Sequence, residues 1–505
     1  MRYLYAPPSV CSGELAYPGL DETYARRRRC EWSSTVPELI DSSHSTTMPE
    51  ADAVVILGGG IIGFSIAYYL SQDPQYKGRI HIVDAADRLF ESASGYAGGF
   101  LARDWFAEKA APLGEFSFNL HRELAGEHNG HKRWGYLGSH VYSLSLNDAP
   151  AGVRGEDWLL AGTSRAQAAG GRREYGHVSR PGEAVNEDGT PAWMAPQMGA
   201  SWNAIAGTDD CAQVEPRKLC EFLLSECEKR GVSIHLNTRT TRLGKQSSSR
   251  LSMLELESNN SQSTTLLCSD IIISAGCWTP RVWTTLFPTS PVEVKIDGLA
   301  GHSVIYRTPR YNNPFLNASY GSGEHSQSKD QHISYAIYCP PTKSWTYSPE
   351  AYARLDGDGK PEIWIGGLND NSTDLPLPDL PTDAKKLINP ARLAELRRAA
   401  VQLTGMTDPN GGVAEDDLEV VSEALCFRPV SQSGVPIIQQ IPHRALGLGS
   451  KGKPGAKVWM ASGHGPWGIS MSLGTGAVMS DLVSGRRPSV DVSGLCVELP
   501  ASSKL

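Results

Sequence analysis

Residues 52–72 read DAVVILGGGIIGFSIAYYLSQ, an apolar stretch interrupted by glycines. Residues 53–57 predict a buried strand, and the residues after the glycines predict a helix. Gly58, Gly60 and Gly63 fill the pattern G-x-G-x-x-G, which provides a tight turn, room for a pyrophosphate and close packing of helix on strand. The pattern indicates a dinucleotide-binding site at the N-terminus of a helix.

A second apolar segment, RIHIVDA at residues 79–85, predicts the next strand of the same sheet. It ends at Asp84, about 20 residues after Gly63, where a carboxylate accepts hydrogen bonds from ribose hydroxyls in such folds. Strand, glycine turn, helix and acid stand in the order of a nucleotide-binding βαβ unit. The simpler alternative is a glycine-rich turn without a ligand, followed by an acid that contacts only solvent.

Small residues crowd the next segment, SASGYAGGFLARDW at residues 92–105. They allow the backbone to lie close to something flat or anionic. A second passage along a pyrophosphate and a flavin ring fits them better than a nicotinamide alone, and a plain flexible loop is the alternative. The residues concerned are Ser92, Ser94, Gly95, Gly98 and Gly99.

Together these segments resemble the superfamily of FAD-dependent D-amino-acid, sarcosine and glycine oxidases, and within it the Tda3-like oxidoreductases of fungi. Three more segments, at residues 212–243, 269–282 and 458–488, are similar to family segments in the same order. The resemblance covers residues 51–495 with gaps. It implies FAD as the cofactor. The further cofactor contacts that it implies are Ile61, Ile62, Leu101, Thr240, Ala275, Gly276, Trp278, Gly463, Gly465, Trp467, Gly468 and Ile469.

The fold class expected from this resemblance is α/β, with a doubly wound, Rossmann-like FAD-binding domain interleaved with a mainly antiparallel α+β substrate domain. We expect residues 51–119, 208–287 and 426–495 in the FAD-binding domain. Residues 120–207 and 288–425 are expected in the substrate domain, with long loops at 147–200. Residues 1–50 predict a disordered extension, and residues 496–505 a tail.

The segment EALCFRPVSQSGVPII at residues 423–438 carries one arginine among apolar neighbours, and such an arginine needs an anion. By resemblance to glycine and D-amino-acid oxidases, Arg428 of the Arg-Pro pair binds the substrate carboxylate; the alternative is pairing with a structural carboxylate. Cys426 is similar in place to a cysteine that bonds to the flavin in sarcosine and fructosyl amino-acid oxidases. A free buried cysteine is the commoner role of such a residue.

The loop GHGPWGIS at residues 463–470 precedes a helix whose N-terminus would favour negative charge on the flavin pyrimidine ring. His464 in this loop either contacts flavin or substrate, or stabilises the turn. The reaction that the resemblance implies is hydride transfer to flavin N5 from a carbon next to an amine, followed by reoxidation by O2 to H2O2. The alternatives are a flavin dehydrogenase, a tailoring enzyme of secondary metabolism, and a trafficking or scaffold protein that FAD stabilises.

Composition sets outer limits on function. The 505 residues have a net charge of −8, which argues against a general nucleic-acid binder. No pattern typical of a metal site and no apolar stretch typical of a membrane span is present. The partners that the family resemblance implies are a small-molecule amine or amino-acid-like substrate and O2.

The two ends of the sequence raise separate questions. Met48 directly precedes the first predicted strand, so either Met1 or Met48 is the natural start. The last three residues, Ser503, Lys504 and Leu505, form the tripeptide that the peroxisomal import receptor reads. We expect a peroxisomal location, with the cytoplasm as the alternative.

Overall fold

The computed structural model describes residues 53–146, 190–191, 193–195, 199–245, 251–311, 333–343, 345–405, 418–448 and 455–497. All of them belong to one compact unit, Ala51–Leu505. The predicted extension at 1–50, residues 147–189 of the long loops expected at 147–200, and the Ser503–Leu505 signal lie outside the described residues.

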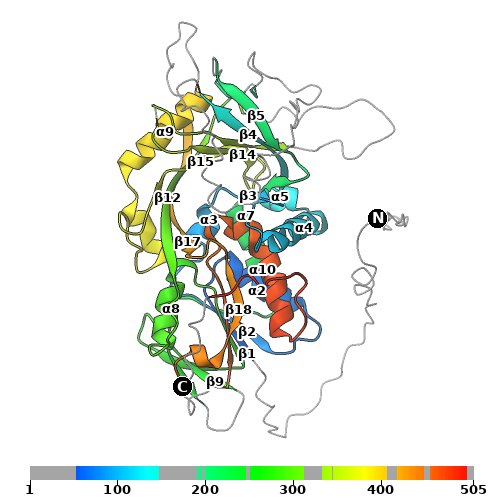
Figure 1. The fold of residues 1–505 in the computed structure, drawn as a ribbon, viewed down its shortest axis with the longest axis vertical. Coiled ribbons are helices and arrows are strands. Elements are labelled where there is room, and N and C mark those ends of the chain that lie inside the picture. Colours follow the sequence, from blue (N-terminus) through cyan, green and yellow to red (C-terminus); the bar gives the residue numbers. More distant parts are fainter. Residues whose placement is uncertain are drawn as a thin grey trace, which may run out of the picture. The chain divides into compact units, whose positions relative to one another are not determined.

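A six-stranded sheet is built around the strand predicted at residues 53–57 (Figure 1). Its order is β18-β19-β11-β1-β2-β7. Five strands are parallel to one another, and β18 is antiparallel to β19. The strands are β1 (Ala53–Leu57), β2 (Arg79–Val83), β7 (Ser233–His235), β11 (Asp270–Ile273), β18 (Ile437–Ile441) and β19 (Lys457–Ser462).

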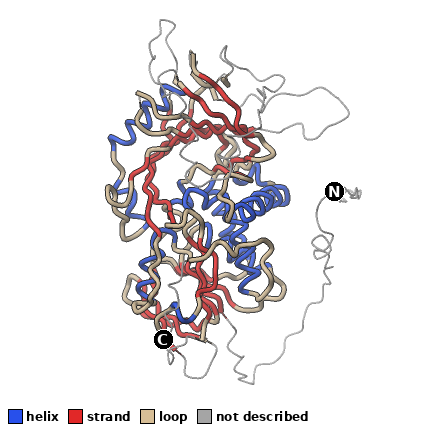
Figure 2. Tube along the Cα trace, in the orientation of Figure 1, coloured by secondary structure: helices blue, strands red, loops and turns tan. Residues whose placement is uncertain are grey.

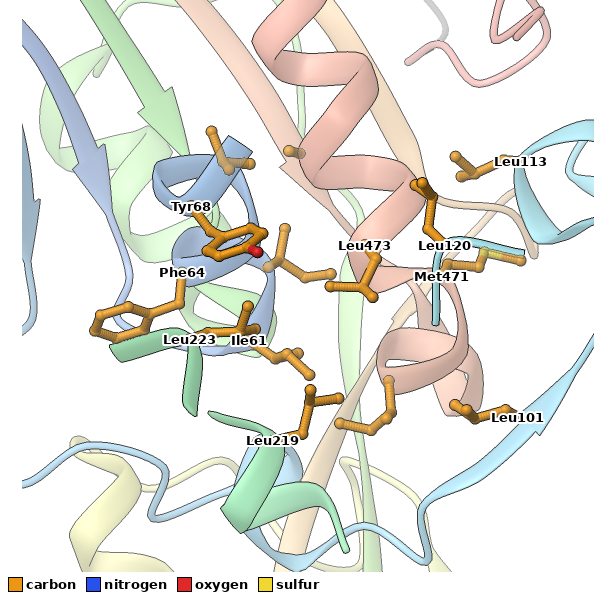
Figure 3. Packing of buried hydrophobic residues seen from close by; sticks show 14 of the residues in the cluster. Ile61, Phe64, Tyr68, Leu101, Leu113, Leu120, Leu219, Leu223, Met471 and Leu473 are labelled. Atoms are coloured by element: carbon orange, nitrogen blue, oxygen red, sulfur yellow. The ribbon is translucent and has the colours of Figure 1, made fainter. Parts of the chain in front are cut away.

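The two faces of this sheet bury alternate residues of β1. Val54 and Ile56 belong to the core formed with α2 (Ile61–Gln72), α7 (Pro216–Lys229) and α10 (Gly468–Val483), shown in Figure 3. Val55 and Leu57 belong to a second core on the opposite face. There the cover is α8 (Thr279–Leu286) and a three-stranded antiparallel sheet, β8 (Thr238–Lys245), β9 (Ser252–Ser258) and β10 (Ser263–Cys268). Burial on both faces explains why β1 is apolar throughout.

A ten-stranded sheet forms the other large layer; the strands of both sheets are red in Figure 2. Its order is β16-β12-β15-β14-β13-β4-β6-β3, with β17 paired to β12 and β5 to β4; all pairs are antiparallel except β4 with β13. Its strands are β3 (Phe100–Ala102), β4 (Leu137–Ser145), β5 (Ser201–Ala206), β6 (Cys211–Gln213), β12 (Ile296–Arg307), β13 (Ile333–Tyr338), β14 (Glu350–Leu355), β15 (Pro361–Gly366), β16 (Asn369–Asp370) and β17 (Glu419–Ser431).

Helices outside the six-stranded sheet complete the unit. Helix α9 (Pro390–Thr404) buries Leu393 and Leu396 in the core of the ten-stranded sheet. Helix α4 (Ala111–His128) packs on α10, with Ser117 Oγ accepting a hydrogen bond from Gly474 N at 3.0 Å. The short helices are α3 (Ala93–Tyr96) and α5 (Gly130–Trp134).

The predicted fold class is confirmed: a largely parallel sheet covered on both faces is joined to a mainly antiparallel one. The predicted FAD-binding segments contain every strand of the six-stranded sheet. They also contain β3 and β6, which pair in the ten-stranded sheet, and the predicted boundary at 425/426 falls inside β17. The domain boundaries therefore stay predictions.

Candidate functional site

A cavity of about 350 Å³ is lined by residues of both sheets. On the six-stranded side its walls come from the turns after β1, β2, β11 and β19. On the ten-stranded side they come from β12, β13, β14, β15 and β17. Ligand sites at the carboxyl ends of parallel strands are the rule in open α/β sheets, and this cavity follows it.

The turn after β1 lies against the backbone after β11. Gly58 has φ of +120°, and a Cβ on it would lie 2.6 Å from Ser274 O. Glycine is therefore required at this position for both conformation and space. A Cβ on Gly60 would lie 3.1 Å from Ser94 Oγ, which accepts a hydrogen bond from Ile61 N at 3.0 Å. Helix α2 begins here with no side-chain cap at Gly60, so its N-terminus can hold an anion.

Asp84 stands at the end of β2, beside the same turn. Its Oδ2 accepts a hydrogen bond from Gly59 N at 2.7 Å, and its Oδ1 accepts one from Ala86 N at 2.9 Å. Burial raises the pKa of this carboxyl, against the lowering effect of both backbone bonds. A carboxylate oxygen accepts more than one hydrogen bond, so the turn contact leaves capacity for a ribose hydroxyl.

The loop after β19 leads into a second helix N-terminus at the cavity. Helix α10 begins at Gly468 with no side-chain cap at Trp467. His464 is buried in this loop, and its Nε2 lies 3.0 Å from Thr475 Oγ1 within α10. Burial lowers the pKa of His464 to about 3, so the imidazole is neutral at physiological pH. The neutral ring ties the loop to its own helix.

Thr240 supplies a separate indication that a ligand fills the cavity. It lines the cavity, and its buried Oγ1 has no hydrogen-bond partner. Buried polar atoms in native proteins are nearly always satisfied. Two helix N-termini whose N-cap residues make no side-chain cap bond, a glycine turn without room for side chains and this unsatisfied hydroxyl fit a bound dinucleotide.

Comparison with known proteins agrees with this geometry. The sequence pattern of the DAO family, described as "FAD dependent oxidoreductase", matches residues 53–482. The chain belongs to the DAO family of FAD-dependent oxidoreductases. It is therefore an enzyme whose cofactor is FAD, and the residues around the cavity fit that group.

Relatives and solved structures cover most of the chain. "Putative oxidoreductase C1F5.03c" of Schizosaccharomyces pombe is 26% identical over 86% of this chain and 95% of its own length. "Putative oxidoreductase TDA3" of Saccharomyces cerevisiae is 23% identical over 88% and 93%. The crystal structure of glycine oxidase from Geobacillus kaustophilus has a TM-score of 0.59 and 18% identity, covering 89% of this chain and 99% of that one. The last similarity concerns the fold alone.

Most of the predicted cofactor residues lie at the wall of the cavity. Those lining it are Gly58, Gly60, Ile61, Ile62, Asp84, Ser92, Ser94, Gly98, Gly99, Thr240, Ala275, Gly276, Trp278, Gly465, Trp467, Gly468 and Ile469. Their individual roles toward FAD stay predictions.

Four predicted cofactor residues lie behind this wall instead. A Cβ on Gly63 would overlap Gly58 O, and one on Gly95 would overlap Phe90 O. Leu101 is fully buried in the core. Gly463 has φ of +81° and adjoins Ser431, 3.0 Å from where its Cβ would lie. These four positions shape the backbone that carries the lining residues.

Arg428 projects into the cavity from β17, on the same strand face as Cys426. One Nη donates to Asn369 Oδ1 at the edge of the sheet, whereas the buried Nε has no hydrogen-bond partner. No carboxylate oxygen of the described residues lies within 4.0 Å of a guanidinium nitrogen of Arg428, the limit for an ion pair. Gly301 on β12 leaves room for the guanidinium, since a Cβ there would lie 2.8 Å from Nη2. The alternative role for Arg428 is pairing with a structural carboxylate, and no such ion pair exists among the described residues.

Cys426 is a free, buried thiol at the cavity wall. Burial raises its pKa, and Arg428 opposes that change. Because the thiolate is the reactive form of cysteine, this environment suits the inert thiol better than a flavin-linked sulfur. The covalent link stays a prediction.

The sequence did not single out the residues opposite Arg428. Glu350 and Tyr352 on β14 and Trp364 on β15 all line the cavity. Tyr352 stacks on Trp364, with ring centroids 5.1 Å apart and planes 8° apart. The signal was the alternation EAYARL at residues 350–355, in which Glu350, Tyr352 and Arg354 share one face. Which face pointed at a cavity could not be read from the pattern.

Proposed function

We propose that this enzyme oxidises the C–N bond of an amine or amino-acid-like substrate by hydride transfer to flavin N5, and that O2 reoxidises the cofactor to give H2O2. The observation that carries the proposal is Arg428. A buried N–H of a cationic group that lacks a hydrogen-bond partner costs free energy, so a guanidinium whose Nε is unsatisfied in a cavity is best explained by an anionic ligand. A carboxylate matches its planar fork.

FAD supplies the hydride acceptor when it is bound. The chain's own residues bind and orient the substrate. Arg428 binds the carboxylate, and the aromatic side chains of Tyr352 and Trp364 form an apolar wall beside it. The neutral His464 adds no positive charge that would compete for the carboxylate. The name of the glycine oxidase that shares this fold agrees with an amino-acid substrate.

The test is a panel of D-, L- and N-methyl amino acids mixed anaerobically with the purified, FAD-loaded enzyme. We expect at least one member to bleach the oxidised flavin, and air to restore the colour with one H2O2 per turnover. Bleaching without peroxide in air would identify a dehydrogenase that uses another acceptor. Failure of every amine, combined with slow reoxidation of photoreduced enzyme, would favour the scaffold alternative and contradict the proposal.

Two variants test whether Arg428 binds the substrate carboxylate. Arg428→Lys keeps the charge but loses the fork, and Arg428→Ala loses both. We expect KM for the best acid substrate to rise about tenfold for the first and about a hundredfold for the second. Flavin content should not change. An unchanged KM would show that another group binds the carboxylate.

We also propose that Ser503–Leu505 directs the enzyme to peroxisomes, where H2O2 is disposed of. These residues lie outside the described part of the chain, and the proposal is supported by the sequence alone. A fluorescent protein fused ahead of residue 1 should give punctate signal that becomes diffuse when Leu505 is deleted. A diffuse signal for the intact chain would favour the cytoplasm.

A further inference from the structure

Glu350 is a buried acid on the cavity wall that the proposed carboxylate anchor does not use. Its Oε2 accepts a hydrogen bond from Tyr352 Oη at 2.5 Å, and that hydroxyl lies 3.1 Å from Tyr338 Oη. Within the described residues no donor reaches Oε1. The side chain is only 6% exposed, and it lines the same cavity as Arg428. Glu350 Oε1 therefore can accept a hydrogen bond from a ligand in the cavity.

The groups that face Glu350 leave it without a countercharge in contact. Tyr352 lies on its own strand, Tyr338 is its cross-strand neighbour on β13, and the neighbour on β15 is Gly366. Arg428 on β17 lowers the pKa of Glu350, but burial is the larger effect and raises it. The two groups form no ion pair within 4.0 Å. The cavity thus holds an acid and a guanidinium that interact electrostatically. Within the described residues, Glu350 Oε1 and Arg428 Nε each lack a hydrogen-bond partner.

We infer that Glu350 binds the amino group of the substrate, so that the enzyme takes a zwitterionic amino acid between Glu350 and Arg428 and discriminates against 2-hydroxy acids. The inference rests on the proposed function and narrows its substrate class. An ammonium group donates a charge-assisted hydrogen bond to Oε1. A hydroxyl in its place brings no charge to offset the buried carboxylate, and sites built around such a group reject analogues that leave it unpaired.

Two ligands of equal shape isolate this contact. 2-Aminoisobutyrate and pivalate both carry a carboxylate and both lack a hydrogen on the α-carbon, so the enzyme cannot oxidise either at that carbon. They differ in having an ammonium or a methyl group there. Dissociation constants are measured on the FAD-loaded enzyme from changes in the visible flavin spectrum, which needs no turnover.

We expect the native enzyme to bind 2-aminoisobutyrate at least about tenfold more tightly than pivalate. Glu350→Gln should bring the ratio close to one by weakening 2-aminoisobutyrate, while Arg428→Lys should weaken both ligands. Glu350→Asp keeps the acid but withdraws it from the ligand by one methylene, so it should reduce the preference without abolishing it. Glu423→Gln, a change at an exposed acid on β17, is the matched control and should leave the ratio unchanged.

A native ratio near one, including the case in which neither ligand changes the spectrum, would overturn the inference. So would a preference that survives in Glu350→Gln, provided that its flavin content and Tm equal those of the native enzyme. If Glu350→Gln loses flavin, a preference that is reduced in Glu350→Asp supports the inference, and a preference that is unchanged there overturns it. If the preference depends on Glu350 but no amine bleaches the flavin, the binding assignment stands and the proposed oxidation fails. If amines bleach the flavin but the preference does not depend on Glu350, the proposed oxidation stands and the binding assignment fails.

Discussion

Gly63 lies in the first turn of α2, where any side chain would overlap the carbonyl oxygen of Gly58. The overlap is with backbone, so it cannot be relieved by a rotamer change. Gly63→Ala must push α2 away from the turn that precedes it, and overpacking of this kind costs about 1–3 kcal/mol.

We therefore expect Gly63→Ala to lower both the Tm and the FAD content of the purified enzyme. The matched control is Gly126→Ala in α4, where a Cβ meets nothing within 4 Å. Alanine favours helix over glycine by about 0.8–1.0 kcal/mol, so the control should be neutral or stabilising. Equal flavin content in both variants would contradict the role given to Gly63.

His121 links α4 to the start of α10 through a buried contact. Its Nε2 donates to Ile469 O at 3.0 Å, and burial lowers its pKa from 6.5 to about 4. Between pH 6.5 and about pH 4, His121 is protonated in the unfolded chain but stays neutral in the folded chain. Stability contributed by the neutral ring is thus fully present above pH 6.5 and is lost as the pH falls toward 4.

His121→Gln keeps a donor for Ile469 O and removes the titration. Between pH 7.5 and pH 5.5 the native enzyme should lose about 1.3 kcal/mol more stability than the variant does. Denaturant unfolding at the two pH values measures the difference, with exposed His443→Gln as the control. An identical pH dependence in His121→Gln and the native enzyme would show that the ring is not held neutral.

At the scale of elements, an ion pair across β14 and β15 supports the cavity wall that these strands form. Arg354 and Glu362 are directly paired across these strands, and Arg354 Nε donates to Glu362 Oε1 at 2.9 Å. The same guanidinium donates to Gly98 O at 2.8 Å, which ties the ten-stranded sheet to the glycine loop at the cofactor site. Both side chains are at most 5% exposed, so the charges depend on each other.

Arg354→Met should destabilise the enzyme strongly, by about 3–5 kcal/mol, because it leaves the Glu362 carboxylate buried without its partner. Adding Glu362→Gln removes that charge, and the double variant should recover part of the lost Tm. Its flavin content should remain below native, since Gly98 O still lacks the hydrogen bond from Arg354 and keeps only the one from Gln213 Nε2. A double variant no more stable than the single one would mean that the pair is not electrostatically coupled.

At the scale of the whole molecule, the cofactor cavity is where the two sheets meet. The glycine turns of its wall follow strands of the six-stranded sheet, whereas Arg428 and Tyr352 belong to the ten-stranded one. A ligand that touches both walls stabilises the folded unit as a whole, by about 2.7 kcal/mol at a hundredfold excess over Kd.

Thermal unfolding of flavin-stripped enzyme tests this arrangement. Added FAD should raise the Tm progressively with concentration. ADP, which has the adenosine and pyrophosphate groups but no isoalloxazine, should raise it distinctly less at the same concentration. Equal shifts from the two ligands would place the flavin ring outside the cavity.

The sequence by itself determined the parts of this protein whose signals are local. The spacing of Gly58, Gly60 and Gly63 between a strand and a helix predicts the dinucleotide-binding turn, because the steric requirements of that turn fall on residues a few positions apart. The order of further segments indicated the family and its FAD. Arg428 was predicted as an anion-binding residue because a lone arginine in an apolar strand requires an anion wherever it lies, and its role toward a substrate stays a prediction.

Only the tertiary structure decided what stands opposite that arginine. Glu350, Tyr352 and Trp364 lie on strands whose alternation reads the same whether a face meets a core or a cavity. Their approach to Arg428 depends on the pairing of β12 with β15 and with β17. The first joins residues about 60 positions apart in the chain, and the second joins residues more than a hundred positions apart. Register over such separations is set by packing of the whole sheet, so it cannot be read from any one segment.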